Sequence, residues 1–264
     1  MEAQPILSGV LSLIPISDSN PTSRFAYVTL GLIIANVFIF FFVEPGPPQF
    51  ADTPIKADVY FVEHAALPCQ LPGHACPDRP VQFGAGGPVI DIPHRSLLSF
   101  LEAMVLSGFL HANILHVGGN MLFLWIFGNN VEDHLGPLKY ALFYLAAIFA
   151  SGLAQIVPNL HPLGQAVTPA VGASGAIAAI LGAYIVLFPR ARIRTLLPLF
   201  IIFTLVQIPA WAYLGIWLAY QVLIPQPGVA WQAHVGGFVF GVIAILVLGG
   251  RPRSPRQKTS GWTY

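Results

Sequence analysis

Charged residues are scarce in this sequence of 264 residues. Asp, Glu, Lys and Arg together make up 9% of it, whereas about a quarter of a typical soluble domain is charged. Hydrophobic residues make up 55%, and the mean hydropathy is +0.70. The net charge is only +1 and no basic stripe is visible, which argues against nucleic acid as a partner. The composition therefore predicts a protein that crosses a lipid bilayer several times.

The N-terminal region lacks the features of a cleavable signal peptide. Residues 1–20 contain neither a basic start nor an A-x-A cleavage site, so we expect the first span to be a retained anchor. The sequence also lacks a tandem repeat and a second soluble domain. This plain architecture favours the plasma (inner) membrane of a bacterium or archaeon over an organelle.

Long apolar runs are abundant, and a membrane span needs about 20 such residues. The predicted fold class is all-α, a polytopic bundle of six transmembrane helices within residues 24–250. The fifth span is long and contains Pro209, which is expected to kink or break the helix. The aromatic residues beyond it are predicted to be interfacial anchors: Trp211, Tyr213, Trp217 and Tyr220. The six predicted spans are residues 25–43, 113–131, 139–157, 173–189, 196–222 and 233–249.

Basic residues predict the orientation of the bundle. Nine of the twelve Lys and Arg residues lie at positions that a six-span topology puts on one side of the membrane. The positive-inside rule assigns that side to the cytoplasm. The N-terminal segment 1–23 and the basic tail 251–264 are then cytoplasmic. The loop 44–112 faces outward. The nine residues are Arg24, Lys139, Arg190, Arg192, Arg194, Arg251, Arg253, Arg256 and Lys258.

The only two cysteines, Cys69 and Cys76, lie in this outward loop. Outward compartments are oxidising in many cells, so a local disulfide is the preferred interpretation. A zinc site that adds His64 and His74 is an alternative, although the spacing matches no standard pattern. Two free thiols are the third interpretation. We predict no bound metal and no cofactor.

Polar side chains inside membrane spans are costly, and each one is a candidate functional residue. His116 and Asn120 are four residues apart and share one helix face, while His111 lies at the outer end of that helix. Ser174 lies just inside the outer end of the fourth span. His234 lies about one turn inside the outer end of the sixth. The topology therefore places these side chains at similar depth.

A serine becomes a good nucleophile when a neighbouring base takes its proton, and His234 is the natural base for Ser174. The spans contain no Asp or Glu to orient the histidine, so we expect a dyad rather than a triad. Small residues spaced four apart allow the fourth and sixth helices to pack closely. These residues are Ala178 and Gly182 on the fourth helix, and Gly237 and Gly241 on the sixth.

Attack on a peptide carbonyl creates an oxyanion, which needs preorganised donors. The backbone N–H of Ser174 and the side chains of His116 and Asn120 are the candidates. Each residue also has a structural interpretation, because a serine between glycines is most often a packing residue and an intramembrane His or Asn often bonds a neighbouring helix. The shared depth of all of them in one topology favours the catalytic interpretation.

Three motifs in this sequence resemble the signatures of the rhomboid family of intramembrane serine proteases. H-x-x-x-x-H-x-x-x-N is present as His111, His116 and Asn120, followed by FGNNVEDHLG with Glu132 and Gly136. G-x-S-G is present as Gly172, Ala173, Ser174 and Gly175. A-H-x-x-G-x-x-x-G is present as Ala233, His234, Gly237 and Gly241. The resemblance covers about residues 24–250.

The resemblance implies a six-helix core with Ser174 as nucleophile, His234 as general base, and His116 and Asn120 at the oxyanion. It also implies that the substrates are membrane-anchored proteins, cleaved in or near the outer part of the bilayer. Two features depart from many members of the family. The stretch from Arg95 to Ser107 contains no Trp, and Ala178 stands where some members have an aromatic residue beside the histidine.

The predicted function is therefore that of an intramembrane serine endopeptidase whose site opens outward. The alternative is a non-proteolytic chaperone or binding protein that uses the same cavity to hold unstable transmembrane helices. A small-solute transporter is a third interpretation, but the spans contain no acidic residue and no inverted repeat. The sequence predicts neither the physiological substrate nor the oligomeric state.

Overall fold

A computed structural model describes residues 13–45, 54–82, 89–161, 163–199, 202–226 and 228–251 of the chain. Most of the N-terminal segment 1–23, parts of the long loop and the basic tail beyond Arg251 lie outside the described residues. The predictions made for those parts stay predictions.

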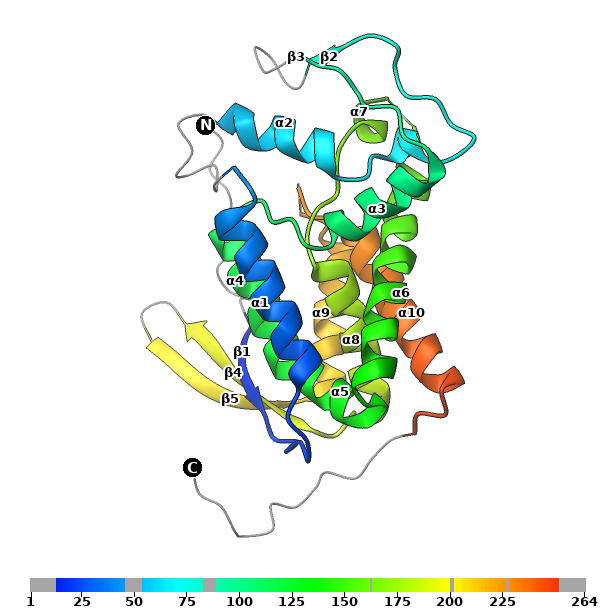
Figure 1. Cartoon of the computed structure of the whole chain (residues 1–264). Coiled ribbons are helices and arrows are strands. Elements are labelled where there is room, and N and C mark those ends of the chain that lie inside the picture. Colours follow the sequence, from blue (N-terminus) through cyan, green and yellow to red (C-terminus); the bar gives the residue numbers. More distant parts are fainter. Residues whose placement is uncertain are drawn as a thin grey trace.

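The chain is mostly helical (Figure 1). The elements of the first half are α1 (Tyr27–Phe42), α2 (Pro54–His64), the short 3-10 helix η2 (Pro68–Gln70), α3 (Leu97–Ser107), α4 (Ile114–Phe123), the π-helical turn η3 (Leu124–Gly128) and α5 (Asn129–Leu135). The second half contains α6 (Pro137–Ile156), η4 (Val157–Asn159), α7 (Leu163–Ala166), α8 (Ser174–Leu187), α9 (Ala210–Leu223) and α10 (Trp231–Val247).

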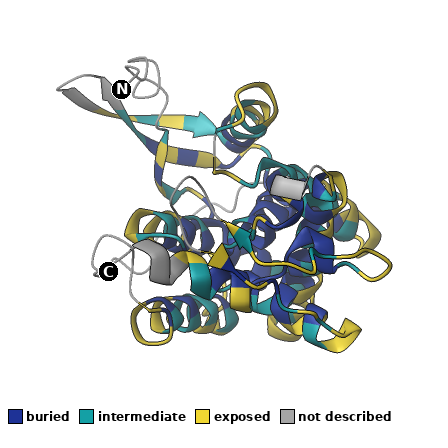
Figure 2. Ribbon diagram, turned by 90° about the horizontal axis from the view of Figure 1, so that it is seen from above, coloured by how far each residue is buried: buried dark blue, intermediate teal, exposed yellow. Residues whose placement is uncertain are grey.

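Helix α8 lies in the centre of the bundle. Its residues from Gly175 to Tyr184 are all buried, because α10, α6, η3 and α9 surround it. A helix that is hydrophobic on every side, as this one is, needs such an enclosed position. The buried residues of the chain gather within the bundle of helices (Figure 2).

Helices α8 and α10 approach each other along small residues. A Cβ atom built on Gly241 would collide with the backbone of Ala179, and one built on Gly237 would collide with the carbonyl oxygen of Gly175. Gly182 faces the backbone of Phe238 in the same way. The contact is therefore backbone against backbone, as the small-residue stripes predict.

The prediction of an all-α fold with a fifth span over residues 196–222 is wrong in its first half. Residues Arg192–Leu199 and Ile202–Pro209 form an antiparallel hairpin, β4 and β5, and β4 also pairs with β1 (Ile14–Asp18). Helix α9 begins only after Pro209. Apolar length alone does not distinguish a strand from a buried helix, whereas the β-branched residues of this stretch favour strands.

One helix has the length and composition expected of a membrane span. Among the described residues, Pro137–Asn159 is the one helix that is both long enough and apolar enough to cross a membrane. Other apolar helices, such as α1, α8, α9 and α10, are shorter, with 10–17 residues. Helices α4, η3 and α5 follow one another without a break from Ile114 to Leu135.

The helices run between two ends of different character (Figure 1). Helices α2, α3 and α7 and the small hairpin of β2 (Val81–Gln82) and β3 (Val89–Ile90) lie at one end, and the sheet of β1, β4 and β5 lies at the other. Arg24, Lys139 and Arg190 belong to the sheet end, because they lie next to β1, at the start of α6 and just before β4.

Glu132 joins the first turn of α1 to α5. Its two carboxylate oxygens accept hydrogen bonds from the backbone N–H groups of Val28 and Thr29, at 2.9 and 2.8 Å, and from the Thr29 hydroxyl at 2.7 Å. A carboxylate at this position satisfies free N–H groups of the helix start and complements its dipole. This contact gives Glu132 a structural role close to the sheet end of the bundle.

Candidate active site

Ser174 is the first residue of α8. The backbone just before it turns sharply, because Gly172 has a φ of 126°, a conformation that favours glycine. The N–H of Gly172 donates to the carbonyl of Ser107 at 2.8 Å and thereby ties this turn to α3. The helix start places Ser174 beside a cavity, together with backbone N–H groups that have no partner within the helix.

The structure brings Ser174 and His234 together. The Nε2 atom of His234 lies 2.8 Å from the Oγ atom of Ser174, across the contact between α10 and α8. His234 is buried, with 8% of its surface exposed. The glycines of α10 allow this distance, because Gly237 lies one turn below His234 and faces the backbone of Gly175.

Two residues of α9 also contact His234, and the sequence reasoning missed both. The Oε1 atom of Gln221 lies 2.8 Å from the Nδ1 atom of His234. The ring of Trp217 lies 5.7 Å from the imidazole, at an interplanar angle of 37°. From the sequence we expect only Asp or Glu to orient the histidine, and we expect Trp217 to be an interfacial anchor.

The aromatic residues of α9 differ from that prediction in a second way. Tyr213, also predicted to be an interfacial anchor, is 1% exposed, and its hydroxyl donates to the carbonyl of Leu13 at 2.8 Å. Trp211, in contrast, is exposed. The helical register of α9, which begins only after Pro209, separates these two faces.

His116 and Asn120 lie on the other side of the serine. A Cβ atom built on Gly172 would be 2.7 Å from the Cε1 and Nε2 atoms of His116 and 3.6 Å from the Nδ2 atom of Asn120. Both side chains therefore border the turn that leads into Ser174. Their position on one face of α4 follows from the four-residue spacing.

His111 supports Asn120. Its Nδ1 atom lies 3.1 Å from the carbonyl oxygen of Phe109, and its Nε2 atom lies 2.9 Å from the Nδ2 atom of Asn120. A carbonyl oxygen can only accept, so Nδ1 carries the proton and Nε2 accepts from the Asn120 amide. Burial lowers the pKa of His111 to about 3, which keeps the ring neutral. One N–H of Asn120 is thus fixed by His111.

Glu44, at the end of α1, holds the backbone of His111. Its carboxylate accepts the His111 N–H at 3.0 Å, and only 7% of the residue is exposed. Burial raises the pKa of this carboxyl from 4.5 to about 7, although the hydrogen bond lowers it in part. A buried acidic group therefore lies two contacts away from Asn120.

Glu44→Gln is expected to stabilise the protein at pH 8 and to have little effect near pH 4. Since the folded state raises the carboxyl pKa, it binds more protons than the unfolded state between pH 4.5 and about 7, and stability falls as the pH rises through this window. The amide removes the cost of burying a charge and still accepts the His111 N–H. Thermal unfolding in detergent should show a gain of about 1 to 2 kcal/mol at pH 8, which is less than the full pKa shift implies because solvent screens part of the charge. An equal difference at both pH values would contradict this account.

A cavity of about 980 Å³ opens at these residues. Ser174 and His234 form part of its wall, and α2 contributes Asp58 and Phe61, so the long loop covers one side of it. The wall combines apolar side chains with a few polar groups, which is typical of a ligand site. Its polar members besides Asp58 are Asn113, His116, Asn120, Thr168, Ser174, Gln221 and His234.

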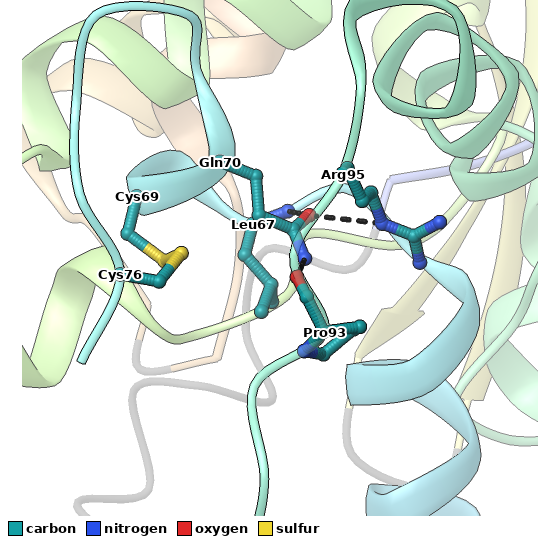
Figure 3. The surroundings of a disulfide bond; sticks show 6 residues. All are labelled: Leu67, Cys69, Gln70, Cys76, Pro93 and Arg95. Carbon is teal, nitrogen blue, oxygen red and sulfur yellow. Dashed lines mark hydrogen bonds between the residues drawn. A yellow bond between two sulfur atoms is a disulfide. The ribbon is translucent and has the colours of Figure 1, made fainter. Parts of the chain in front are cut away.

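The long loop contains a disulfide between Cys69 and Cys76, and this bond leaves no thiolate for a zinc site (Figure 3). Among the described residues, no group of three or more His, Cys, Asp or Glu side chains could hold a metal ion. Next to the disulfide, Gln70 accepts from the N–H of Leu67 at 3.0 Å and donates to the carbonyl of Pro93 at 2.9 Å.

Arg95 anchors this loop, although the stretch from Arg95 to Ser107 contains no Trp. Its Nε atom donates to Oε1 of Gln70 at 3.2 Å (Figure 3), and its Nη2 atom donates to the carbonyl of Glu63 at 2.5 Å. Arg95 thereby connects the end of α2 with η2 and the start of α3.

Replacing both Cys69 and Cys76 by serine is expected to destabilise the loop by about 2 kcal/mol, because the unfolded loop regains the freedom that the cross-link removes. Hydrogen exchange of residues 54–82 should become faster, and Ala75→Ser, an exposed change in the same loop, serves as the control. Unchanged exchange in the double variant would show that Gln70 and Arg95 hold the loop without the disulfide.

The fold and the site define a helical membrane protein with a serine and a histidine in hydrogen-bond contact at a cavity. A model of the rhomboid domain matches residues 100–251, and the chain belongs to the rhomboid family. At family level this supports an intramembrane serine protease, although some rhomboid homologues are inactive. The matched range contains the positions of Ser174, His234, His116, Asn120 and Gln221.

The chain is similar to several proteins of known name. It is 32% identical over 143 residues to Rhomboid protein 1, mitochondrial, of Saccharomyces cerevisiae, which covers 52% of this chain and 39% of the relative. It is 30% identical over 160 residues to RHOMBOID-like protein 12, mitochondrial, of Arabidopsis thaliana (54% and 45%). It is 32% identical over 148 residues to the human presenilin-associated rhomboid-like protein, mitochondrial (53% and 36%). The chain therefore spans less than half the length of these relatives.

Proposed function

We propose that this protein is an intramembrane serine endopeptidase that cleaves the transmembrane segments of membrane-anchored proteins. The observation that carries the proposal is the distance of 2.8 Å between Ser174 Oγ and His234 Nε2 at the wall of a large cavity. A serine within hydrogen-bond reach of a histidine is the arrangement that activates a hydroxyl nucleophile. Membership of the rhomboid family supports the same chemistry.

The proposed reaction has two stages. Ser174 Oγ attacks the substrate carbonyl while His234 Nε2 takes the hydroxyl proton, and His234 then gives this proton to the leaving amine. A water molecule next attacks the acyl-enzyme, again with His234 as the base, and the serine is regenerated. Each stage forms an oxyanion, for which the N–H of Ser174, His116 and the second N–H of Asn120 are the proposed donors.

The short length of α8 supports cleavage below the membrane surface. Its 14 residues span roughly 21 Å, whereas the hydrocarbon core of a bilayer is about 30 Å thick. If the sheet end of α8 lies at one surface, Ser174 lies several ångströms inside the other. The cavity at Ser174 then supplies the polar space that water needs at this depth.

We propose that six helical segments span the membrane: α1, the run from α4 to α5, α6, α8, α9 and α10. They alternate in direction between the two ends of the bundle (Figure 1), and the basic residues Arg24, Lys139, Arg190 and Arg251 gather at the sheet end. The positive-inside rule then assigns the sheet end to the cytoplasmic side. The cavity and the disulfide-bearing loop face outward.

The identity of the membrane is a separate proposal. The relatives named above are all called mitochondrial, which favours a mitochondrial membrane for this chain over the plasma membrane expected from the sequence. In either membrane, the disulfide of the long loop calls for an oxidising compartment on that side. Fractionation of the source cells, with the disulfide state of the loop measured in each fraction, would decide between the two.

Access to the cavity is proposed to involve α9 and the segment after it, residues 224–231. Several residues along α9 are exposed, among them Trp211 and Ile216, and α9 has a smaller contact with α10 than α8 has. An element with few buried contacts is suited to movement. Cleavage that persists after α9 is cross-linked to α4 would contradict this role.

The test is cleavage of a transmembrane-segment substrate by the purified chain in liposomes. The native chain is expected to release both halves of the substrate, with no added metal. A chaperone or binding protein with the same cavity would instead retain the intact substrate, and Ser174→Ala would then bind as the native chain does. Binding without cleavage across a varied panel of substrates would replace the protease proposal with that alternative.

A further inference from the structure

We propose that Gln221 of α9 is the positioning residue for His234: its side-chain oxygen holds the proton on Nδ1 and leaves Nε2 free for the Ser174 hydroxyl. The catalytic consequence rests on the function proposed above. The assignment of the proton itself rests only on the geometry of the three side chains.

The two ring nitrogens of His234 have different partners. Nδ1 lies 2.8 Å from Gln221 Oε1, and Nε2 lies 2.8 Å from Ser174 Oγ. An amide oxygen can only accept, so the contact with Gln221 requires a proton on Nδ1. A neutral imidazole carries one proton, and Nε2 is therefore the acceptor for the serine hydroxyl.

An amide suits this position better than a carboxylate would. His234 is buried among α8, α9 and α10. An ionised carboxylate in place of the Gln221 amide would have to lose its hydration in this environment, which costs free energy. The amide dipole fixes the tautomer and interacts favourably with the positive charge that forms on His234 during the reaction. Gln221 is thus a neutral third residue beside Ser174 and His234.

Gln221 also makes the base dependent on the position of α9. It lies in the last turn of that helix, one turn beyond Trp217, and both side chains face His234 from the same side. A shift of α9 away from α10 would separate Gln221 from Nδ1. His234 would then lose the acceptor that defines its tautomer, while Ser174 on α8 stayed in place.

The experiment is NMR spectroscopy of the full chain with ¹⁵N-labelled histidine in detergent micelles, where the ring nitrogen shifts report the tautomer. The signal of His234 is identified by its loss in His234→Gln. We expect the native protein to carry the proton on Nδ1. Gln221→Leu should yield a mixture of tautomers, whereas Gln221→Glu, which keeps an oxygen acceptor, should keep the proton on Nδ1.

Kinetics of the same variants give the second measurement. Gln221→Leu should lower kcat on the order of 10- to 100-fold with little change in KM, because only the base is disturbed. Gln221→Glu should recover most of this loss. Leu223→Ala is the matched control, since this residue is 76% exposed on the same turn of α9 and is expected to resemble the native chain.

Two results would overturn the inference: a proton on Nε2 in the native protein, which would mean that the Gln221 amide group donates to Nδ1, or an unchanged tautomer in Gln221→Leu. If the native chain cleaves no substrate, the proposed function fails, but the NMR result still decides the role of Gln221. If cleavage depends on Ser174 and His234 while the tautomer is independent of Gln221, the function stands and this inference falls.

Discussion

Replacing Ser174 by alanine is expected to lower the rate of substrate cleavage by at least roughly 10³-fold, and His234→Ala is expected to do the same. The two residues act as a unit, because the hydroxyl is reactive only while His234 Nε2 accepts its proton. The double variant should therefore be no slower than either single variant. Initial rates of peptide release from a liposome-bound substrate would measure all three.

These substitutions should leave the fold and the cavity in place. Alanine at position 174 removes one oxygen and retains the helix start after Gly172, so the melting temperature in detergent and the binding of intact substrate serve as controls. A double variant whose rate is the product of the two single effects would indicate that Ser174 and His234 act independently. That outcome would be inconsistent with the proposed dyad.

Gly241→Ala is expected to destabilise the protein by about 2 to 3 kcal/mol and to abolish cleavage as well. The added methyl group would occupy the space of the Ala179 backbone, which cannot move aside as a flexible side chain can. Helices α8 and α10 must then separate, and this movement also pulls His234 away from Ser174. Thermal unfolding and the cleavage assay would register the two effects.

Gly31→Ala is the matched control for this prediction. Gly31 lies in α1 with no atom within 4 Å of an added Cβ, so alanine there should be neutral or slightly stabilising. If Gly241→Ala unfolds at the same temperature as Gly31→Ala, the close approach of α8 and α10 is not a source of stability. The effect on cleavage would then need another explanation.

The sequence carried most of the information about the residues that meet at the cavity. Ser174, His234, His116 and Asn120 could be placed at one depth because membrane spans alternate in direction and because polar residues within them are rare. The packing of α8 on α10 followed from the spacing of small residues. These signals depend on local spacing and on topology, both of which a sequence contains.

Gln221 and the hairpin of β4 and β5 could not be found in the same way. Gln221 contacts His234 only because α9 begins after Pro209 and thereby acquires its particular register against α10. The strands could not be predicted because the apolar run 196–222, with 27 residues, is long enough for a membrane-spanning helix. In both cases, the decisive contact is between segments whose pairing a hydrophobicity pattern does not specify.

The pairing of β1 with β4 has a consequence for the order in which the chain folds. Ile14 pairs with Leu196 and Asp18 with Ile193. Strand β1 therefore cannot pair until β4, about 175 residues later in the chain, has been synthesised. Contacts between such distant positions close slowly, since the intervening chain must be in place first. Helix α1 can therefore enter the membrane early, but the segment before it gains its final position only after α8 has been made. We expect the sheet to be the last part of the molecule to form during synthesis.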